Sequence, residues 1–435
     1  MQRYDSYKDS GVKWLGEIPS HWEVKRLRAA LTERKERYSS SESLMILSLI
    51  KDKGIIPYDE KGEVGNKSKD DHTQYKVARK GDLVINSMNV IIGSLGVTPY
   101  DGYISPAYYA FKPQKGINLA YYNYLLSLRK VQQSIRCFSK GIMEIRLKIS
   151  AYDFLSMPFP FPSLKEQEAI ANYLDTATSK IDEAIAQQQK MIDLLNERKQ
   201  IIINNAVTKG LDPNVKMKPS GVDWIGDIPE HWEVMKTLFA LSMPITDGPH
   251  ETPQLYEEGV PFVSAEAVSC GNGKIDFDHI RGFISKAFYD ECCKKYKPQV
   301  NDIYMIKSGA TTGKVAIVDT DRVFTIWSPL AVFRCNPSVI YFKYMFYVLQ
   351  SKPYQIQVQL GWSFGTQQNI GMRTLEKLMI PVPPIGEQIQ LASLLDDKIN
   401  QVENCIKLAK NQISLLQERK QIIINDVVTG KVKVI

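Results

Sequence analysis

The chain has 435 residues, of which 44% are hydrophobic and 24% charged, a composition typical of folded proteins rather than disordered or fibrous ones. Its net charge of +7 permits an anionic partner without requiring one. No apolar run approaches the roughly 18 residues of a membrane span, and the first residues lack the apolar core of a signal peptide. The six cysteines form no CxxC pair, so we expect no disulfide framework or zinc ribbon, and a reducing cytoplasm fits best.

The first element is a tryptophan-rich segment that occurs twice. Residues 10–24 read SGVKWLGEIPSHWEV and residues 220–234 read SGVDWIGDIPEHWEV, identical at 11 of 15 positions. We call these two segments the tryptophan motifs. Farther along, LLNERKQIIIN at 194–204 recurs as LLQERKQIIIN at 415–425, with 10 of 11 positions identical. Two repeats in the same order, about half a chain apart, predict a duplicated domain.

The middle of each half, residues 25–150 and 235–370, has little sequence in common with the other but keeps its landmarks. Gly81-Asp82 corresponds to Asn301-Asp302, and Gly93 corresponds to Gly313. Apolar runs beside turn glycines predict strands, and aromatic-rich segments with helical spacing predict helices, which together indicate a compact α+β domain. The predicted strands are 82–87, 303–307 and 314–318, and the predicted helices are 118–129 and 339–350.

Each half ends in a long predicted helix. Residues 165–204 and 387–428 contain neither proline nor glycine, and each run follows a proline-rich junction. Apolar residues recur in both at spacings of three and four, which is typical of a coiled-coil seam, although an amphipathic helix on a globular core has a similar pattern. The seam comprises Leu174, Ile181, Ile185, Ile192, Leu195 and Ile202 in the first helix, and Leu395, Ile399, Val402, Ile406, Ala409, Ile413, Leu416 and Ile423 in the second.

The order of the elements predicts how the helices pair. The second helix begins where the first ends, so we expect an antiparallel pair within one chain. A helix of about 38 residues is about 57 Å long at ~1.5 Å per residue. By symmetry, the first tryptophan motif should pack near the end of the second helix. The sequence therefore predicts an α+β fold with two globular domains, an intrachain antiparallel coiled coil and a circular, pseudo-two-fold organisation.

The chain resembles the specificity subunits of type I restriction–modification enzymes. The resemblance rests on Trp14-x-Gly-x-Ile-Pro-x-His-Trp22, its copy Trp224-x-Gly-x-Ile-Pro-x-His-Trp232, the junctions ending in Glu166-Gln167 and Glu387-Gln388, and the ERKQ helices. It covers the whole chain, in the same order twice. It implies two target recognition domains that read a bipartite, asymmetric site in double-stranded DNA. It also implies two bound methyltransferase (modification) subunits, and it allows a motor-nuclease (restriction) subunit to join them.

The resemblance also implies a division of the chain. Residues 1–150 would hold the tryptophan motif and target recognition domain 1, residues 151–210 the junction and first long helix, residues 211–370 the repeated motif and target recognition domain 2, and residues 371–435 the second junction and helix. At about 3.4 Å per base pair, a helix of the predicted length covers more than one turn of DNA. We therefore expect the coiled coil to set the unread spacer.

The distribution of charge suggests where DNA binds. Residues 25–150 carry 22 Lys and Arg against 12 Asp and Glu, whereas residues 235–370 carry 13 against 12. Basic and hydroxyl side chains in polar, glycine-containing loops are the candidates for phosphate contacts, although plain surface charge is the alternative for each residue. The candidates are Lys51, Lys53, Lys61, Lys67, Lys69 and Lys76 in the first middle, and Lys274, Arg281, Lys307, Thr311, Thr312 and Lys314 in the second.

Motifs for catalysis are incomplete. Asn336-Pro337-Ser338 matches only the start of an amino-methyltransferase motif, and the segment from Gly309 to Val315 fails the phosphate-loop spacing, which favours a strand-to-strand turn. No histidine pair has metal-ligand spacing, so we expect no catalytic residue, metal or cofactor. The rival hypotheses are a stand-alone DNA nuclease or methyltransferase and a coiled-coil scaffold that binds only protein.

Overall fold

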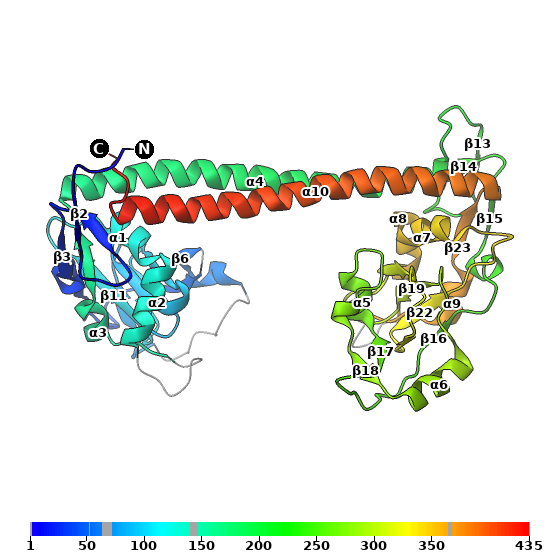
Figure 1. Cartoon of the computed structure of the whole chain (residues 1–435), viewed down its shortest axis with the longest axis horizontal. Helices are drawn as coiled ribbons and strands as arrows, with labels where there is room; N and C mark the ends of the chain where they lie inside the picture. The colour runs from blue at the N-terminus through cyan, green and yellow to red at the C-terminus, as the bar shows by residue number, and fades with distance from the viewer. Residues whose placement is uncertain (1, 52, 63–71, 140–146, 364–367, 435) are drawn as a thin grey trace. The chain divides into compact units, whose positions relative to one another are not determined.

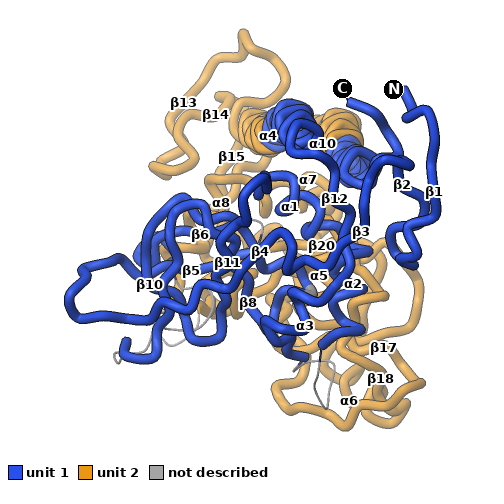
Figure 2. Tube along the Cα trace, turned by 90° about the vertical axis from the view of Figure 1, so that its left-hand side faces the viewer, with its two compact units in different colours: residues 1–189, 411–435 blue, residues 190–410 orange. Residues whose placement is uncertain are grey.

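The computed structural model describes residues 2–51, 53–62, 72–139, 147–363 and 368–434 (Figure 1). The chain divides into two compact units, distinguished by colour in Figure 2. Unit 1 comprises residues 1–189 and 411–435, and unit 2 comprises residues 190–410. Each unit therefore contains one tryptophan motif, one middle region and one end of each long helix.

Unit 1 is built from short strands in four sheets. Its two larger sheets have the orders β4-β11-β8-β9 and β6-β5-β10-β7, and two pairs, β1-β2 and β3-β12, lie in the frame around them. The strands are β1 Tyr7–Asp9, β2 Glu17–Pro19, β3 Glu23–Arg26, β4 Leu31–Glu33, β5 Met45–Ile50, β6 Gly54–Pro57, β7 Lys76–Ala78, β8 Leu83–Asn86, β9 Leu95–Val97, β10 Gly102–Ile104, β11 Tyr108–Pro113 and β12 Pro158–Phe161. The helices are η1 Leu27–Ala29, η2 Tyr58–Lys61, η3 Val90–Ile92, α1 Leu119–Leu126, α2 Arg129–Phe138 and α3 Ala151–Ser156.

Unit 2 repeats this plan. Its larger sheet, β16-β22-β19-β20, has the same topology as β4-β11-β8-β9, and a three-stranded sheet, β18-β17-β21, stands beside it. The strands are β13 Met217–Pro219, β14 Asp227–Pro229, β15 Glu233–Lys236, β16 Thr246–Asp247, β17 Val260–Val263, β18 Gly282–Ile284, β19 Ile303–Ile306, β20 Val315–Ile317, β21 Thr325–Ile326, β22 Leu330–Phe333 and β23 Met379–Val382. The helices are η5 Thr237–Ala240, α5 Ala265–Cys270, η6 Phe277–His279, α6 Lys286–Lys295, α7 Phe342–Gln350, α8 Lys352–Leu360 and α9 Met372–Lys377.

The two long helices are α4, Leu164–Lys209, and α10, Ile385–Val428, which have 46 and 44 residues. Both are longer than the predicted 38 residues. The start of α4 is set by a capping box, in which Ser163 Oγ accepts from Glu166 N–H at 3.3 Å and Ser163 N–H donates to Glu166 Oε2 at 3.1 Å. A glycine with positive φ follows each helix within two residues, Gly210 (73°) after α4 and Gly430 (75°) after α10, as is common at helix C-termini.

The antiparallel pairing of the long helices is confirmed within each unit. In unit 1, the start of α4 (Ile170, Leu174) and the end of α10 (Ile424, Val427) share one hydrophobic core. In unit 2, the end of α4 and the start of α10 do the same, through residues that include Ile203 and Leu395. Every predicted seam residue is buried or half-buried. The seam is therefore an interface between the two helices, and the ends of both helices also pack into the globular cores.

The circular organisation is also confirmed in unit 1. Gly430, just after α10, lies so close to the first tryptophan motif that a Cβ there would stand 2.9 Å from the Trp22 ring. Lys433 N–H donates to the Gln2 carbonyl at 2.9 Å, and the labels of the two termini stand side by side in Figure 1. The C-terminal segment therefore packs against the N-terminal motif, as the symmetry of the repeats predicts.

Candidate nucleic-acid interface

Each tryptophan motif is attached to the first turn of a long helix by one glutamate. In unit 1, His21 Nε2 lies 2.7 Å from Glu166 Oε1, and the indole N–H of Trp22 donates to the same oxygen at 3.0 Å. In unit 2, His231 Nε2 lies 2.8 Å from Glu387 Oε2, and the Trp232 indole donates at 3.2 Å. Both indole rings are fully buried. The buried indoles and the glutamates hold the frame together, and the two imidazoles cover them at the surface, about half exposed.

The next residue of each helix anchors the globular domain. Gln167 accepts a hydrogen bond from the backbone N–H of Asn118 at 2.9 Å, just before α1. Gln388 accepts one from Tyr341 N–H at 2.7 Å, just before α7. The Glu-Gln pair thus joins three parts of each unit: tryptophan motif, long helix and globular domain. The repeated Glu-Gln pair therefore holds the globular domain of each unit in a fixed position on its long helix.

The pKa of Glu166 gives a test of this attachment. Burial alone would raise the pKa, but hydrogen bonds from His21, Trp22 and Ser163 outweigh burial and lower it. The carboxylate therefore stabilises unit 1 above the unfolded pKa of about 4.3, and this stability is lost as the pH falls through the lower folded pKa.

We expect Glu166→Gln to destabilise unit 1 by about 1–3 kcal/mol at pH 7. In urea melts, the difference in free energy of unfolding between Glu166→Gln and wild type should shrink below about pH 4. The control Glu168→Gln, at an exposed position, should unfold like wild type at pH 7 and at pH 4. A difference in unfolding free energy that persists in acid would contradict the proposed role of the Glu166 carboxylate.

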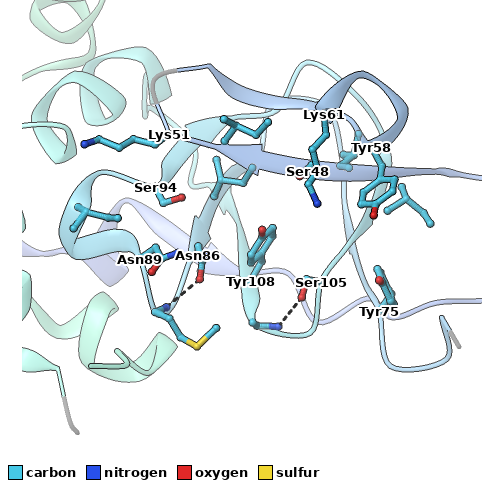
Figure 3. Close-up of a pocket in the computed structure, with 17 residues that line it drawn as sticks. Ser48, Lys51, Tyr58, Lys61, Tyr75, Asn86, Asn89, Ser94, Ser105 and Tyr108 are labelled. Carbon is cyan, nitrogen blue, oxygen red and sulfur yellow. Dashed lines mark hydrogen bonds between the residues drawn. The ribbon is translucent and has the colours of Figure 1, made fainter. Parts of the chain in front are cut away.

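The globular domain of unit 1 contains an open groove of about 540 Å³ (Figure 3). Strands β5 and β8, helix η3 and the segment before β11 line it. Asn86, Asn89, Ser94 and Lys51 gather at one end of the groove in Figure 3. Asn86 Oδ1 accepts a hydrogen bond from Met88 N–H at 3.1 Å, which fixes the turn after β8. Asn86 and Ser94 are buried, so the exposed amide of Asn89 and the ammonium of Lys51 are the groups at this end that can contact base edges and phosphates.

Two of the predicted cations of unit 1 line this groove. Lys51 is exposed, whereas Lys61 is mostly buried with its Nζ 4.7 Å from the centre of the Tyr58 ring. Lys76 donates to the Tyr108 carbonyl at 2.6 Å, and burial lowers its pKa. Lys53 is exposed in the turn between β5 and β6. Lys67 and Lys69 lie outside the described residues. Lys51 and Lys53 are therefore the most accessible described members of this set.

Unit 2 brings only some of its candidates together. Thr312 and Lys314 line a pocket of about 430 Å³ that Lys199 of α4 also borders. Thr311 is half-buried beside Thr312. Gly309 to Lys314 connects β19 to β20, so the strand-to-strand turn is confirmed.

The other candidates of unit 2 already have partners. Lys307 is buried, with its Nζ 3.4 Å from Asp247, and the exposed Lys274 pairs with Asp319 at 2.7 Å. The Arg281 guanidinium stacks over the Trp327 ring at 4.1 Å, which leaves its hydrogen-bonding edges free to contact a planar acceptor pair. Arg281 is therefore a stronger candidate than Lys307.

The neutral lining of the unit 1 groove was missed in the sequence. Excess charge selects lysines and passes over Asn86, Asn89 and Ser94, although these residues lie close together in the sequence, on both sides of Gly93. The attachment of both tryptophan motifs to a glutamate about 145–156 residues away was also missed. Only the repetition of His-Trp and Glu-Gln at matching places in both halves could have suggested that contact.

Comparison with known proteins agrees with this architecture. The sequence model of the type I restriction modification DNA specificity domain matches residues 19–192 and again 251–416, so the chain belongs to this family and carries its domain twice. A Methanocaldococcus jannaschii protein assigned as the specificity subunit of type I restriction enzyme MjaX is 26% identical over 98% of both chains. The EcoBI specificity subunit of Escherichia coli is 23% identical over 62% of this chain and 58% of its own length.

Solved structures share the fold. A chain from a type I R-M system studied for complex assembly and conformational transition aligns over 95% of this chain and 99% of its own, with a TM-score of 0.71 and 15% identity. The HsdS subunit from Thermoanaerobacter tengcongensis aligns over 98% of this chain and 100% of its own, with a TM-score of 0.52 and 16% identity. The predicted fold class and the predicted family are thereby confirmed.

Within the residues that the structure describes, no group of three His, Cys, Asp or Glu side chains could hold a metal ion. None of the helices described is both long and apolar enough to cross a membrane.

Proposed function

We propose that this chain is the DNA-recognition subunit of a type I restriction–modification enzyme, in which each globular domain reads one half of a bipartite, asymmetric site. The observation that carries the proposal is a repeated frame with unlike surfaces. The same Glu-Gln junction holds a globular domain in each unit, while the middle regions 25–150 and 235–370 that form these domains have little sequence in common. Two different globular domains on one repeated frame can each bind a different half of the DNA site.

Selection of bound DNA from a random duplex library tests this function. The complex of this chain with its methyltransferase partner should enrich two defined blocks of bases separated by a stretch without preference. Enrichment of one continuous palindrome would contradict the proposal, as would a profile that the partner alone reproduces. A chain that binds only protein would give no enrichment of its own.

We further propose that the chain is not itself an enzyme, that it needs no cofactor of its own and that it acts in the cytoplasm. Methyl transfer would come from the modification subunits, and DNA cleavage from a restriction subunit where one joins. The α4–α10 pair would set the length of the unread spacer. The division at residues 150, 210 and 370 remains our proposal for the boundaries of the recognition domains. Methylation by the isolated chain would instead favour the stand-alone enzyme.

The surface that we propose for methyltransferase docking is an apolar stripe on each long helix. Leu194 and Ile201 on α4, and Leu415 and Ile422 on α10, are 50–60% exposed although each directly precedes a seam residue. They occupy the same places in the two ERKQ repeats, so each unit carries one copy of the stripe. Exposed apolar side chains repeated in this way favour a partner that binds twice. The repeat lysines, by contrast, pair with the other long helix, Lys199 with Glu403 and Lys420 with Asp182.

Removing one stripe should remove one methyltransferase subunit. We expect the double variant Leu415→Glu, Ile422→Glu to lower the ratio of methyltransferase to this chain from two to one, because buried carboxylates at an apolar interface lack partners. Native mass spectrometry of the purified complex measures the ratio. Ser414→Glu with Gln421→Glu, exposed on the other flank of α10, is the matched control and should leave the ratio at two. An unchanged ratio in the stripe variant would place docking elsewhere.

A further inference from the structure

One pair of hairpins is anchored in the same way in both units. At the start of β8, Asp82 accepts from Arg79 N–H at 2.9 Å and pairs with the guanidinium of Arg34. At the start of β19, Asp302 accepts from Gln299 N–H at 2.9 Å and pairs with Arg334. The residues before them, Gly81 and Asn301, both have positive φ, 87° and 74°. The hairpins β8–β9 and β19–β20 are therefore structural counterparts.

The loops at the far ends of these hairpins begin with the same contact. Ser87 C=O accepts from Ile149 N–H at 3.0 Å, and Lys307 C=O accepts from Ile370 N–H at 2.9 Å. In both units this bond ties the loop to the segment that precedes a short helix, α3 or α9. The first residue of each loop is thus held at an equivalent place.

The loops also end with the same contact. Gly93, with φ of 88°, lies against Gln132 of α2, so that a Cβ would stand 2.9 Å from its Nε2. Gly313, with φ of 94°, lies against Gln355 of α8, whose Nε2 donates to the Gly313 carbonyl at 2.9 Å. A side chain at either glycine would meet both a strained φ and a close neighbour. Both ends of both loops are therefore fixed by equivalent contacts.

Between these anchors lie five residues in each unit, and their chemistry differs completely. Residues 88–92 read MNVII and residues 308–312 read SGATT. In the first loop, Met88 and Ile92 are about half exposed, Asn89 is exposed and Val90 is buried. In the second, hydroxyl and small side chains replace them. Equal length, equal anchoring and unlike side chains are what two readers of different half-sites need.

We propose that residues 88–92 and 308–312 are the base-reading loops of the two recognition domains, and that Asn89 reads an adenine in the half-site of unit 1. This inference rests on the proposed function. An asparagine carboxamide pairs with N6 and N7 of adenine in the major groove, and exposed apolar groups such as Met88 and Ile92 contact the methyl group of thymine. The exposed Lys51 stands at the same end of the groove as Asn89, where it can contact a flanking phosphate (Figure 3). The loop of unit 1 is therefore suited to A·T pairs.

The test measures the binding of the methyltransferase complex to duplexes that each differ from the selected site at one base pair. We expect Asn89→Ala to reduce discrimination at one A·T pair, in one half of the site, by about 10- to 100-fold, with every other position unchanged. Lys115→Ala, exposed in a turn of the same unit, is the control and should leave the profile unaltered. A uniform loss of affinity, or an unchanged profile, would overturn the assignment.

A loop graft tests the pair of loops together. Replacing residues 88–92 by the sequence of 308–312 keeps both anchors and the loop length. Its complex should prefer different bases in the half-site read by unit 1 and the original bases in the other half. A graft that assembles with its methyltransferase but keeps the original preference would overturn the proposal, and if the graft does not fold, Asn89→Ala decides alone. A wild-type profile without two blocks would refute the proposed function, whereas failure in these variants alone refutes only the loops.

Discussion

Exchanging residues 25–150 for the corresponding region of another family member is expected to change the bases recognised in one half of the DNA site and to leave the other half unchanged. The physical reason is that this region has hydrophobic clusters of its own and otherwise packs on residues of the tryptophan motif and the long helices, which the exchange leaves unchanged. It is attached to the frame by a repeated contact, in which Gln167 of α4 accepts a hydrogen bond from Asn118 N–H just before α1. A foreign domain with the same attachment residues should be held in the same way. Sequencing of methylated sites in cells that express the exchanged chain measures the outcome.

The reciprocal exchange of residues 235–370 is the matched control for this experiment. It should change only the other half of the site, because the attachment through Gln388 in unit 2 is equivalent. If either exchange altered both halves, the two domains would not read independently. If neither exchange altered the site, recognition would lie in the frame and not in the globular domains.

The largest loss of stability is expected from Trp22→Ala. The indole is fully buried, packs beside Tyr4 and the C-terminal Gly430, and donates to Glu166. Truncating a buried tryptophan destabilises by about 3–5 kcal/mol. We expect the unfolding transition of unit 1 to move to lower temperature, with unit 2 less affected, when the two transitions are followed by calorimetry.

A tryptophan of the other motif provides the control for this prediction. Trp224 is 39% exposed, so Trp224→Ala should destabilise by clearly less than Trp22→Ala, because it removes less buried apolar surface. Equal effects of Trp22→Ala and Trp224→Ala would show that burial of the motif does not hold the frame together.

The frame of this protein was predictable because it repeats. A long seam without proline or glycine leaves few alternatives to paired helices, and the structure buries or half-buries every seam residue, from Leu174 to Ile423. The repeated Gly81-Asp82 and Asn301-Asp302 landmarks likewise became matched turns with positive φ at the first residue. The paired helices and the matched turns follow from periodicity and repetition along the chain, so they could be predicted from a single sequence.

The recognition surface was much less predictable. The lysine candidates were chosen for charge, yet Lys61 and Lys307 are buried and Lys76 is bound to a backbone carbonyl, because long apolar stems pack inside while their ammonium groups find local partners. Asn89 carries no charge and was passed over, and its place in the groove depends on contacts between Gly93 and Gln132 that lie 39 residues apart. Such contacts come from the tertiary fold and leave no local pattern.

The most direct test of recognition by two domains is a map of methylated adenines in a host that carries this chain together with its methyltransferase subunit. The account predicts methylation at one bipartite, asymmetric sequence with an unread spacer, and loss of all such methylation when this chain alone is deleted. Methylation at a continuous palindrome, or methylation that persists without this chain, would contradict it.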